Sequence, residues 1–184
     1  MSEKNNIQTI LQVLEADINT DESLSLLKEL SGSLNHITGN SGESSFSIDD
    51  MEVEKSIFVI ARSGGKAAGC GAIRRIDDST GELKRMYARE QGLGVGTSIL
   101  NFLENKALEF GFSKLICETR KINVGACSFY IRNGFHVIPN YGKYQGRDEA
   151  VCFEMNQITK RDPASKKTGS LSLSDINKIT GLPH

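Results

Sequence analysis

The stretch that decides the fold reads Glu82-Leu-Lys-Arg-Met-Tyr-Ala-Arg-Glu-Gln91-Gly92-Leu93-Gly94-Val95-Gly96. It predicts a charged strand from Glu82 to Ala88, then a glycine-rich turn, then an amphipathic helix that ends at Gly111. A glycine-rich turn that opens a helix directs several backbone N–H groups at one point, and the helix dipole adds about half a positive charge there. We therefore expect the turn to hold an anion, and most commonly such an anion is a phosphate.

The segments on either side of this stretch alternate between strand and helix patterns, which predicts a mixed α/β fold. The predicted strands cover residues 7–13, 56–62, 67–76, 82–88, 114–119, 135–138 and 149–154. Further helices are predicted after Thr20, where leucines recur at helical spacing, and over Asn123 to Asn133, with a polar loop at 35–50 between helix and strand. Because a helix connects strands 82–88 and 114–119, we expect these two strands to run parallel.

The length of 184 residues suits one domain with a proper core and is too short for two. We expect that domain to cover residues 1–155, and the polar, basic segment 156–184 to form a C-terminal tail with a short helix at Leu173 to Ile179. No apolar run is long enough to span a membrane, and residues 1–20 lack the layout of a signal peptide.

The four cysteines are scattered and include no CxxC pair. Three of them stand in apolar stretches, which is typical of small buried hydrophobes in a reducing compartment, so the predicted location is cytoplasmic. With three histidines and no His or Cys pair at ligand spacing, the sequence predicts no metal site. The cysteines are Cys70, Cys117, Cys127 and Cys152.

The net charge of −1 conceals a gradient along the chain. Residues 1–56 carry eleven acidic and three basic side chains, whereas residues 57–155 carry ten and fourteen. A positive middle suits an anionic ligand. The acidic start is either a solvated surface or a region that attracts a cationic substrate. The tail has five basic residues without aromatic partners, which argues against binding to nucleic acid.

The glycine turn by itself also fits a dinucleotide-binding loop, with Glu118 as the acid that binds the ribose. Two observations argue against this interpretation and against a nucleotide-dependent oxidoreductase. Thr97 stands where the third glycine is required, and the strand before the turn is too charged for a fully buried central strand. A Walker A loop fails because no Lys-Ser/Thr follows at the required spacing.

The segment does resemble the acetyl-CoA loop of the GNAT superfamily of N-acetyltransferases, which has the form Q/R-x-x-G-x-G/A and here reads Gln91 to Gly96. The later segment Asn123-x-x-Ala126-x-x-x-Tyr130-x-x-x-Gly134-Phe135 matches the second signature of that family position for position. The resemblance covers residues 57–155 well and residues 1–56 by the order of elements. It implies the GNAT acyl-CoA N-acyltransferase fold, with a central mixed sheet of six to seven strands flanked by helices.

The resemblance also implies a cofactor platform for acetyl-CoA as acyl donor. Backbone N–H groups of the turn would hold the CoA pyrophosphate, and an exposed N–H near Met86 would bind the oxyanion. Asn123 would hold the pantetheine arm, and it also suits a plain helix N-cap. Gln91 replaces the commoner Arg of the family, and the link from Ala88 to Gln91 is shorter than in many members. The implied cofactor-binding residues are Met86, Tyr87, Ala88, Gln91, Gly92, Leu93, Gly94, Val95, Gly96, Thr97 and Asn123.

Two residues carry the chemistry that the resemblance implies. Tyr130 is the candidate general acid that protonates the departing CoA thiolate, although its helix pattern alone is that of a core aromatic. Glu82 is the candidate general base, and the alternative is a structural Glu paired with Lys84 or Arg75. Tyr141 and Tyr144 follow in a loop that either forms a wall of the acceptor site or is plain surface.

The implied activity is transfer of an acetyl group from acetyl-CoA to a primary amine of a small molecule or peptide by direct attack. The alternative from another class is a catalytically silent module of the same fold that binds CoA. The sequence does not identify the acceptor amine, and it leaves a homodimer open. Loops 35–50 and 139–148 are expected to choose the acceptor.

Overall fold

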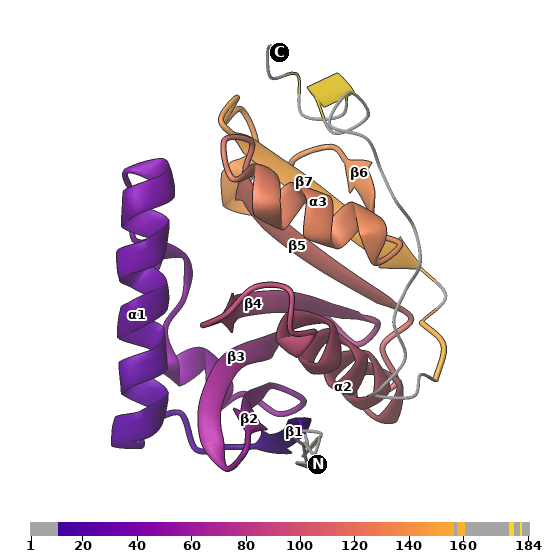
Figure 1. Ribbon diagram of the computed structural model, residues 1–184. Coiled ribbons are helices and arrows are strands. Elements are labelled where there is room, and N and C mark those ends of the chain that lie inside the picture. The colour runs from indigo at the N-terminus through magenta and orange to yellow at the C-terminus, as the bar shows by residue number, and fades with distance from the viewer. Residues whose placement is uncertain (1–10, 157, 161–176, 179–180, 182–184) are drawn as a thin grey trace, which may run out of the picture.

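The computed structural model describes residues 11–156, 158–160, 177, 178 and 181, and its centre is one mixed sheet of seven strands (Figure 1). The order across the sheet is β1-β2-β3-β4-β5-β7-β6, and β4 and β5 are its parallel neighbours. The predicted mixed sheet and the predicted parallel pair are both confirmed. The strands are β1 (Leu11–Glu15), β2 (Ile57–Ser63), β3 (Lys66–Arg75), β4 (Thr80–Ala88), β5 (Lys114–Arg120), β6 (His136–Ile138) and β7 (Ala150–Asn156).

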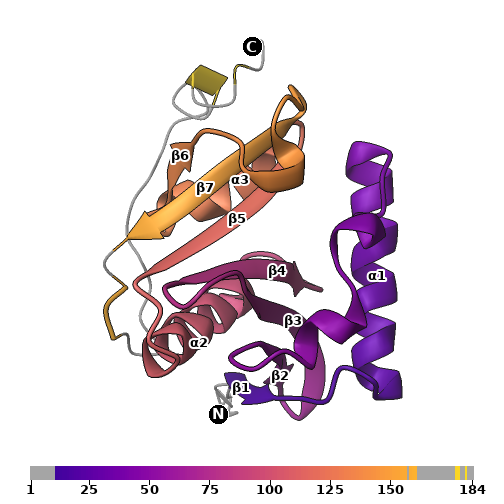
Figure 2. The same cartoon turned by 180° about the vertical axis from the view of Figure 1, so that it is seen from behind.

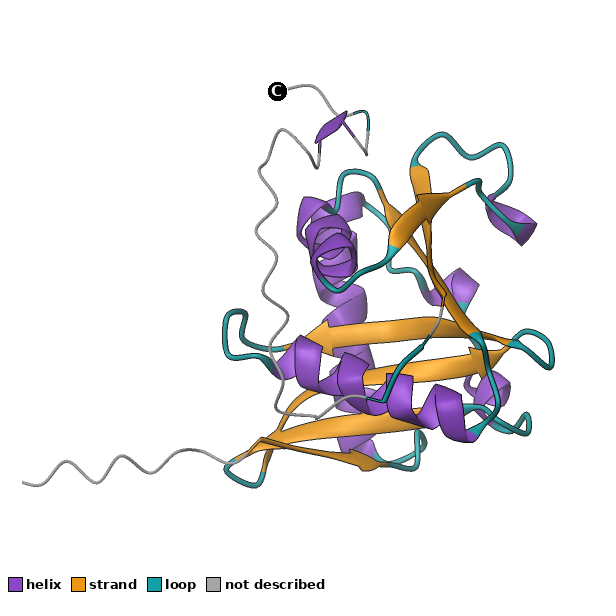
Figure 3. Cartoon of the chain, turned by 90° about the vertical axis from the view of Figure 1, so that its right-hand side faces the viewer, coloured by secondary structure: helices purple, strands orange, loops and turns teal. Residues whose placement is uncertain are grey.

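Helices cover both faces of the sheet (Figure 3). One face carries α1, whose Leu26 packs with Phe58 and Ala72, and the other carries α2 and α3, which enclose the larger core around Ile99 and Phe153. Alternation along each strand sends consecutive side chains to opposite faces, so both cores draw on the same strands. The helices are α1 (Asp21–Thr38), α2 (Val95–Glu109) and α3 (Val124–Arg132), with short 3₁₀ helices η1 (Glu43–Ser45), η2 (Ile48–Met51) and η3 (Gly142–Tyr144) in the loops.

A β-bulge interrupts β4 at Arg85. Cys70 pairs with Tyr87 and Ala72 pairs with Lys84, so two residues of β4 lie opposite Gly71 alone. Arg85 takes a left-handed backbone conformation there, with φ of 53°. A glycine is required at position 71, because a Cβ there would lie 2.6 Å from Ile99 of α2. The bulge and this close approach bring α2 directly onto the middle of the sheet.

The two halves of the sheet separate between β4 and β5. The parallel ladder joins Thr80, Gly81 and Glu82 to residues 114–116, and the rest of β4 lies beyond it. Figures 1 and 2 show the two ribbons close together at one end and diverging toward α1. The backbone of β4 after Glu82 is therefore available on its β5 side to a ligand that lies between the strands.

The element predictions are confirmed with shifted ends. β4 begins at Thr80, two residues before the predicted start, because its first residues pair with β5. α1 extends to Thr38, and the left-handed Gly39 (φ of 71°) ends it. All four cysteines are buried and free, which confirms the burial predicted for the three in apolar stretches and adds the fourth. Within the described ranges, no helix combines the length and apolar character that crossing a membrane requires. The predicted tail helix at 173–179 and the start of the first strand lie largely outside the described residues.

Candidate active site

The glycine turn presents the N-terminus of α2. Gly94 is the N-cap residue in a left-handed conformation, with φ of 79°, and Gly92 has φ of 83°. Gly94 has no side chain with which to cap the helix, so the first N–H groups of α2 stay available to an anion. A Cβ at either glycine would meet no atom within 4 Å. The turn is therefore open on its outer side, which fits the approach of a phosphate to the backbone.

The first turn of α2 lies against the second half of α3. A Cβ at Gly96 would come within 3.2 Å of the Phe129 ring, so the glycine lets the two helices approach. Asn123 is the N-cap of α3, and its side-chain oxygen accepts the N–H of Ala126 at 3.2 Å. The amide N–H₂ of Asn123 is not used in that cap and is left as a donor. The capping role is confirmed, and the role in binding pantetheine stays a prediction.

Tyr130 lies in the core between α3 and the sheet. Its ring contacts Phe129, Phe135 and Phe153, and 6% of its surface is exposed. Burial, and then the neighbouring Cys117 thiol, raise the pKa of the Tyr130 hydroxyl well above its usual value. Cys117 follows directly after the last β5 residue that pairs with β4. The hydroxyl therefore keeps its proton and lies at the level where the two strands separate.

Glu82 is fully buried at the start of that separation, on the sheet face that α1 covers. Its Oε1 lies 3.0 Å from Lys84 Nζ and accepts the Tyr141 hydroxyl at 2.8 Å. Its Oε2 accepts Nε of Arg74 at 3.1 Å, and Nη2 of the same guanidinium is a second donor to it. Arg74 also donates to Asp50 at 3.0 Å. Both carboxylate oxygens are thus occupied, and the partner among the arginines is Arg74 and not Arg75.

The loop that contains η3 covers this charged cluster. The Tyr144 hydroxyl accepts a hydrogen bond of 2.8 Å from Lys84, and the Tyr144 ring packs edge-on against Tyr141 with centroids 5.5 Å apart. Burial and the charge of Glu82 raise the pKa of the Tyr141 hydroxyl, so it remains a donor. The two loop tyrosines therefore pack against the charged cluster and are not plain surface, and their role as a wall of the acceptor site stays a prediction. Neither the charge of Lys84 nor that of Glu82 faces open water, since both side chains are buried.

A second loop, residues 39–47 after α1, is tied to the bulge in β4. Arg85 donates to the carbonyl oxygens of Ser41 at 3.3 Å and Gly42 at 3.0 Å, and its guanidinium lies 5.2 Å from the centre of the Phe46 ring. Burial lowers the pKa of Arg85. Lys143 of the η3 loop donates to the carbonyl oxygen of Ser44 at 3.1 Å, so the two predicted acceptor loops touch.

Glu118 is a second carboxylate at the separation of the strands. It lies on β5 two residues past the last pair with β4, and it pairs with Cys152 of β7. Within the described part of the chain it forms no hydrogen bond or ion pair. Burial raises the pKa of the Glu118 carboxyl, against the opposing effect of the Lys84 charge. The sequence interpretation considered Glu118 only as a ribose-binding acid, because a single strand pattern does not show that β4 and β5 diverge beside it.

The predicted cofactor residues follow the path from β4 to α2. Met86 and Ala88 lie on β4 beyond its ladder with β5, so this stretch is unpaired on its β5 side, and its role in binding the cofactor stays a prediction. The side chain of Tyr87 points elsewhere, because its hydroxyl contacts Glu29 of α1 at 3.4 Å. Leu93 is an apolar residue of the turn whose surface is 61% exposed. The remaining residues of the turn are exposed or half-buried except for Val95, which packs in the core.

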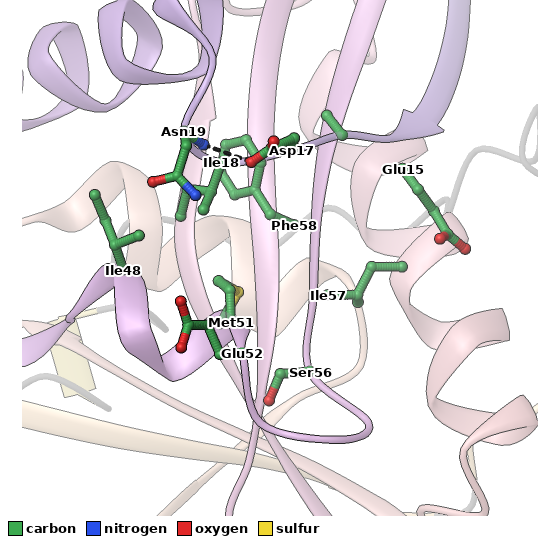
Figure 4. Close-up of a pocket in the computed structure, with 11 residues that line it drawn as sticks. Glu15, Asp17, Ile18, Asn19, Ile48, Met51, Glu52, Ser56, Ile57 and Phe58 are labelled. Atoms are coloured by element: carbon green, nitrogen blue, oxygen red, sulfur yellow. Dashed lines mark hydrogen bonds between the residues drawn. The ribbon is translucent and has the colours of Figure 1, made fainter.

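A pocket of about 490 Å³ lies beside η2 (Figure 4). Its lining comes from the turn between β1 and α1, from η2 and from the start of β2, and it combines apolar side chains such as Met51 and Phe58 with the acids Glu15, Asp17 and Glu52. Asp50 of η2 bonds to Arg74, so one helical turn separates this pocket from the charged cluster.

A mixed sheet that opens between two parallel strands, beside the glycine-rich N-terminus of a helix, is the architecture of the acyl-CoA N-acyltransferases. Comparison with known proteins agrees with that class. The chain matches the family described as the acetyltransferase (GNAT) family over residues 26–135, and it belongs to that family. Acetyl-CoA dependence is typical of the family.

Three individual relatives share between 18% and 32% of their aligned residues with this chain. The chain is 32% identical over 99 residues to an IAA acetyltransferase of Azospirillum brasilense, a match that covers 52% of this chain and 64% of the relative. Its fold resembles that of a putative acyl-CoA N-acyltransferase from Klebsiella pneumoniae, with 25% identity, a TM-score of 0.68, and 80% and 98% of the two chains covered. A GNAT family acetyltransferase from Elizabethkingia anophelis with acetyl-CoA bound has 18% identity and a TM-score of 0.58, with 79% and 97% covered.

Proposed function

We propose that this chain transfers the acetyl group of acetyl-CoA to a primary amine by direct attack. The observation that carries the proposal is the separation of β4 from β5 beside the open N-terminus of α2, with Tyr130, Glu82 and Glu118 around it. The nitrogen–carbon bond forms as the carbon–sulfur bond breaks. The proton of the ammonium goes to a carboxylate, and the sulfur receives a proton from an acid.

The residues present fit acetyl-CoA as the donor, which supplies an activated thioester. The uncapped N–H groups that follow Gly94 suit the pyrophosphate, and the free edge of β4 near Met86 suits the amide groups of a pantetheine arm. The same edge offers an N–H to a developing oxyanion. Asn123 has an unused amide N–H₂ at the start of α3.

Tyr130 is proposed as the general acid. Its hydroxyl keeps its proton because burial raises its pKa, and it lies against Cys117 where the strands separate. Removal of a general acid typically costs about 10²–10⁴ in rate. Tyr130→Phe should therefore lower kcat by about 10² or more while acetyl-CoA binding, measured by thermal shift, stays unchanged. Full turnover by this variant would remove the assignment.

Two carboxylates can take the proton of the amine. Glu82 is the proposal from the sequence, and it reaches the site through Tyr141, whose hydroxyl donates to it. Glu118 has no ion-pair partner among the described residues, and burial raises the pKa of its carboxyl, which makes the carboxylate a stronger base than an ordinary glutamate. Glu82→Gln and Glu118→Gln distinguish them, because the variant that removes the base loses kcat without losing acetyl-CoA binding.

The proposal is tested by thermal shift with acetyl-CoA, followed by release of the CoA thiol in the presence of a panel of primary amines. The expected result is a shift that saturates and a release of thiol that depends on the amine. No shift at saturating acetyl-CoA would overturn the cofactor assignment. A clear shift with no turnover of any amine would favour the alternative, a silent module that binds CoA.

A further inference from the structure

Two lysine ammonium groups lie over the ring of one tyrosine. Nζ of Lys84 lies 5.3 Å from the centre of the Tyr144 ring, and Nζ of Lys143 lies 5.7 Å from the same centre. The two groups differ in their partners. Lys84 is buried and bonded to Glu82 and to the Tyr144 hydroxyl, whereas Lys143 is an exposed residue of η3.

The carboxylates of this cluster are already taken by other cations. Glu82 is shared between Arg74 and Lys84, and Asp50 binds Arg74. Among the described residues, the hydrogen-bond acceptor of Lys143 is the carbonyl oxygen of Ser44, at 3.1 Å, and no carboxylate lies within ion-pair distance of it. Burial, and then repulsion from Lys84 and Arg74, lower the pKa of Lys143. An anion beside Lys143 would relieve that repulsion.

We propose that the acceptor is a small amine that also carries a carboxylate, and that Lys143 binds this carboxylate where the two acceptor loops meet. The inference rests on the proposed acetyl transfer to an amine. The ammonium end of such a molecule faces the carboxylates of the site, of which Glu118 is without an ion-pair partner in the described chain. When the substrate binds, Lys143 exchanges its hydrogen bond to the neutral carbonyl of Ser44 for one to the substrate carboxylate. The second bond is stronger because both of its partners are charged.

Two further features agree with this orientation and size. The pocket beside η2 is lined by Glu15, Asp17 and Glu52, so it would repel a carboxylate and leaves Lys143 as the place for one. The contact from Lys143 to Ser44 joins the loop after α1 to the η3 loop. A small molecule would exchange only this contact, whereas an extended peptide would need the two loops, which also meet at Tyr144 and Ser45, to move apart.

The test uses matched pairs of acceptors that differ only in the carboxylate, such as L-phenylalanine with phenethylamine, L-lysine with cadaverine, and L-tryptophan with tryptamine. Release of the CoA thiol gives kcat/KM for each member at pH 8. For the pair that is turned over fastest, we expect the carboxylate-bearing member to be preferred by about 10- to 100-fold, the value of one charged hydrogen bond.

The variant Lys143→Glu should lower kcat/KM for the carboxylate-bearing member by a similar factor, mainly through KM, and should leave the decarboxylated amine equal or better. Lys66→Glu is the matched control, since Lys66 is an exposed residue of the β2–β3 hairpin and makes the same change in net charge. Thermal shift with acetyl-CoA confirms that both variants are folded and bind the donor.

The outcomes separate the two proposals. Equal or better turnover of the decarboxylated amines by the unmodified protein would overturn the inference about Lys143 and leave acetyl transfer standing. An equal loss in Lys143→Glu and Lys66→Glu would overturn it as well, because the effect would then be one of net charge. Release of no thiol with either member of any pair would overturn the proposed acetyl transfer, and the inference with it.

Discussion

Replacement of Glu82 by Gln should strongly destabilise the folded protein, whatever its effect on catalysis. The side chain of Glu82 is fully buried, and its two oxygens hold Arg74, Lys84 and Tyr141. Gln has the same shape but no charge, so the buried ammonium of Lys84 would lose its counter-ion. An uncompensated buried charge is the costly result of breaking such a pair.

The size of the effect follows from what each partner retains. Arg74 keeps Asp50 at 3.0 Å, and Lys84 keeps the Tyr144 hydroxyl at 2.8 Å and the adjacent ring. Removal of one member of a buried ion pair typically costs about 3–5 kcal/mol, and the retained partners favour the lower end, about 3 kcal/mol. Since small domains are stable by about 5–15 kcal/mol, this is a large share of the total.

The assay is urea unfolding followed by circular dichroism for the wild-type protein, Glu82→Gln, Lys84→Met and the double variant. Because Lys84→Met removes the orphaned charge, the double variant should recover a part of the stability that Glu82→Gln loses. A loss below about 0.5 kcal/mol in Glu82→Gln would refute the reasoning, since changes of that size are typical of exposed sites. Additive losses in the double variant would also contradict it.

Three other predictions concern the neighbouring elements. Gly71→Ala should lower the free energy of unfolding by about 1–3 kcal/mol in the same urea assay, because a Cβ would lie 2.6 Å from Ile99 and α2 would have to move. Arg85→Ala should speed amide hydrogen exchange in the loop after α1, which loses two hydrogen bonds, without changing exchange in α2. Glu118→Gln should raise the urea midpoint at pH 7 and leave it unchanged at pH 4. Burial raises the pKa of Glu118 in the folded state, so ionisation of this carboxyl at pH 7 destabilises the folded protein, and a neutral Gln removes that cost. At pH 4 the carboxyl is largely protonated, and the substitution changes little.

Much of this fold could be predicted from local sequence because local chemistry determines it. Asn123 caps α3, as predicted, because its side chain reaches the N–H of Ala126 three residues on. The parallel pairing of β4 and β5 follows from the helix that connects them. The positions of the strand ends could not be predicted as well, because Thr80 and Gly81 join β4 through pairing with residues 114 and 115, far along the chain.

The candidate site was harder to predict, because its partners come from distant parts of the sequence. The charges of this strand argued against a fully buried central strand, whereas the structure buries the side chains of Glu82 and Lys84. They tolerate burial because Tyr141 and Tyr144, about sixty residues later, supply a hydroxyl to each. No spacing within one segment could show that closure.

The environments of the two carboxylates point to different roles. Glu82 is held on both oxygens by cations and a hydroxyl, so it fixes Lys84 and Arg74 in place. Glu118 has no such partners in the described chain, and burial raises the pKa of its carboxyl, so its carboxylate accepts a proton more readily than an ordinary glutamate does. Stability and turnover therefore separate the roles. A purely structural Glu82 predicts that Glu82→Gln, assayed at a temperature where it is folded, keeps its turnover and that Glu118→Gln does not, while the reverse result would assign the base to Glu82.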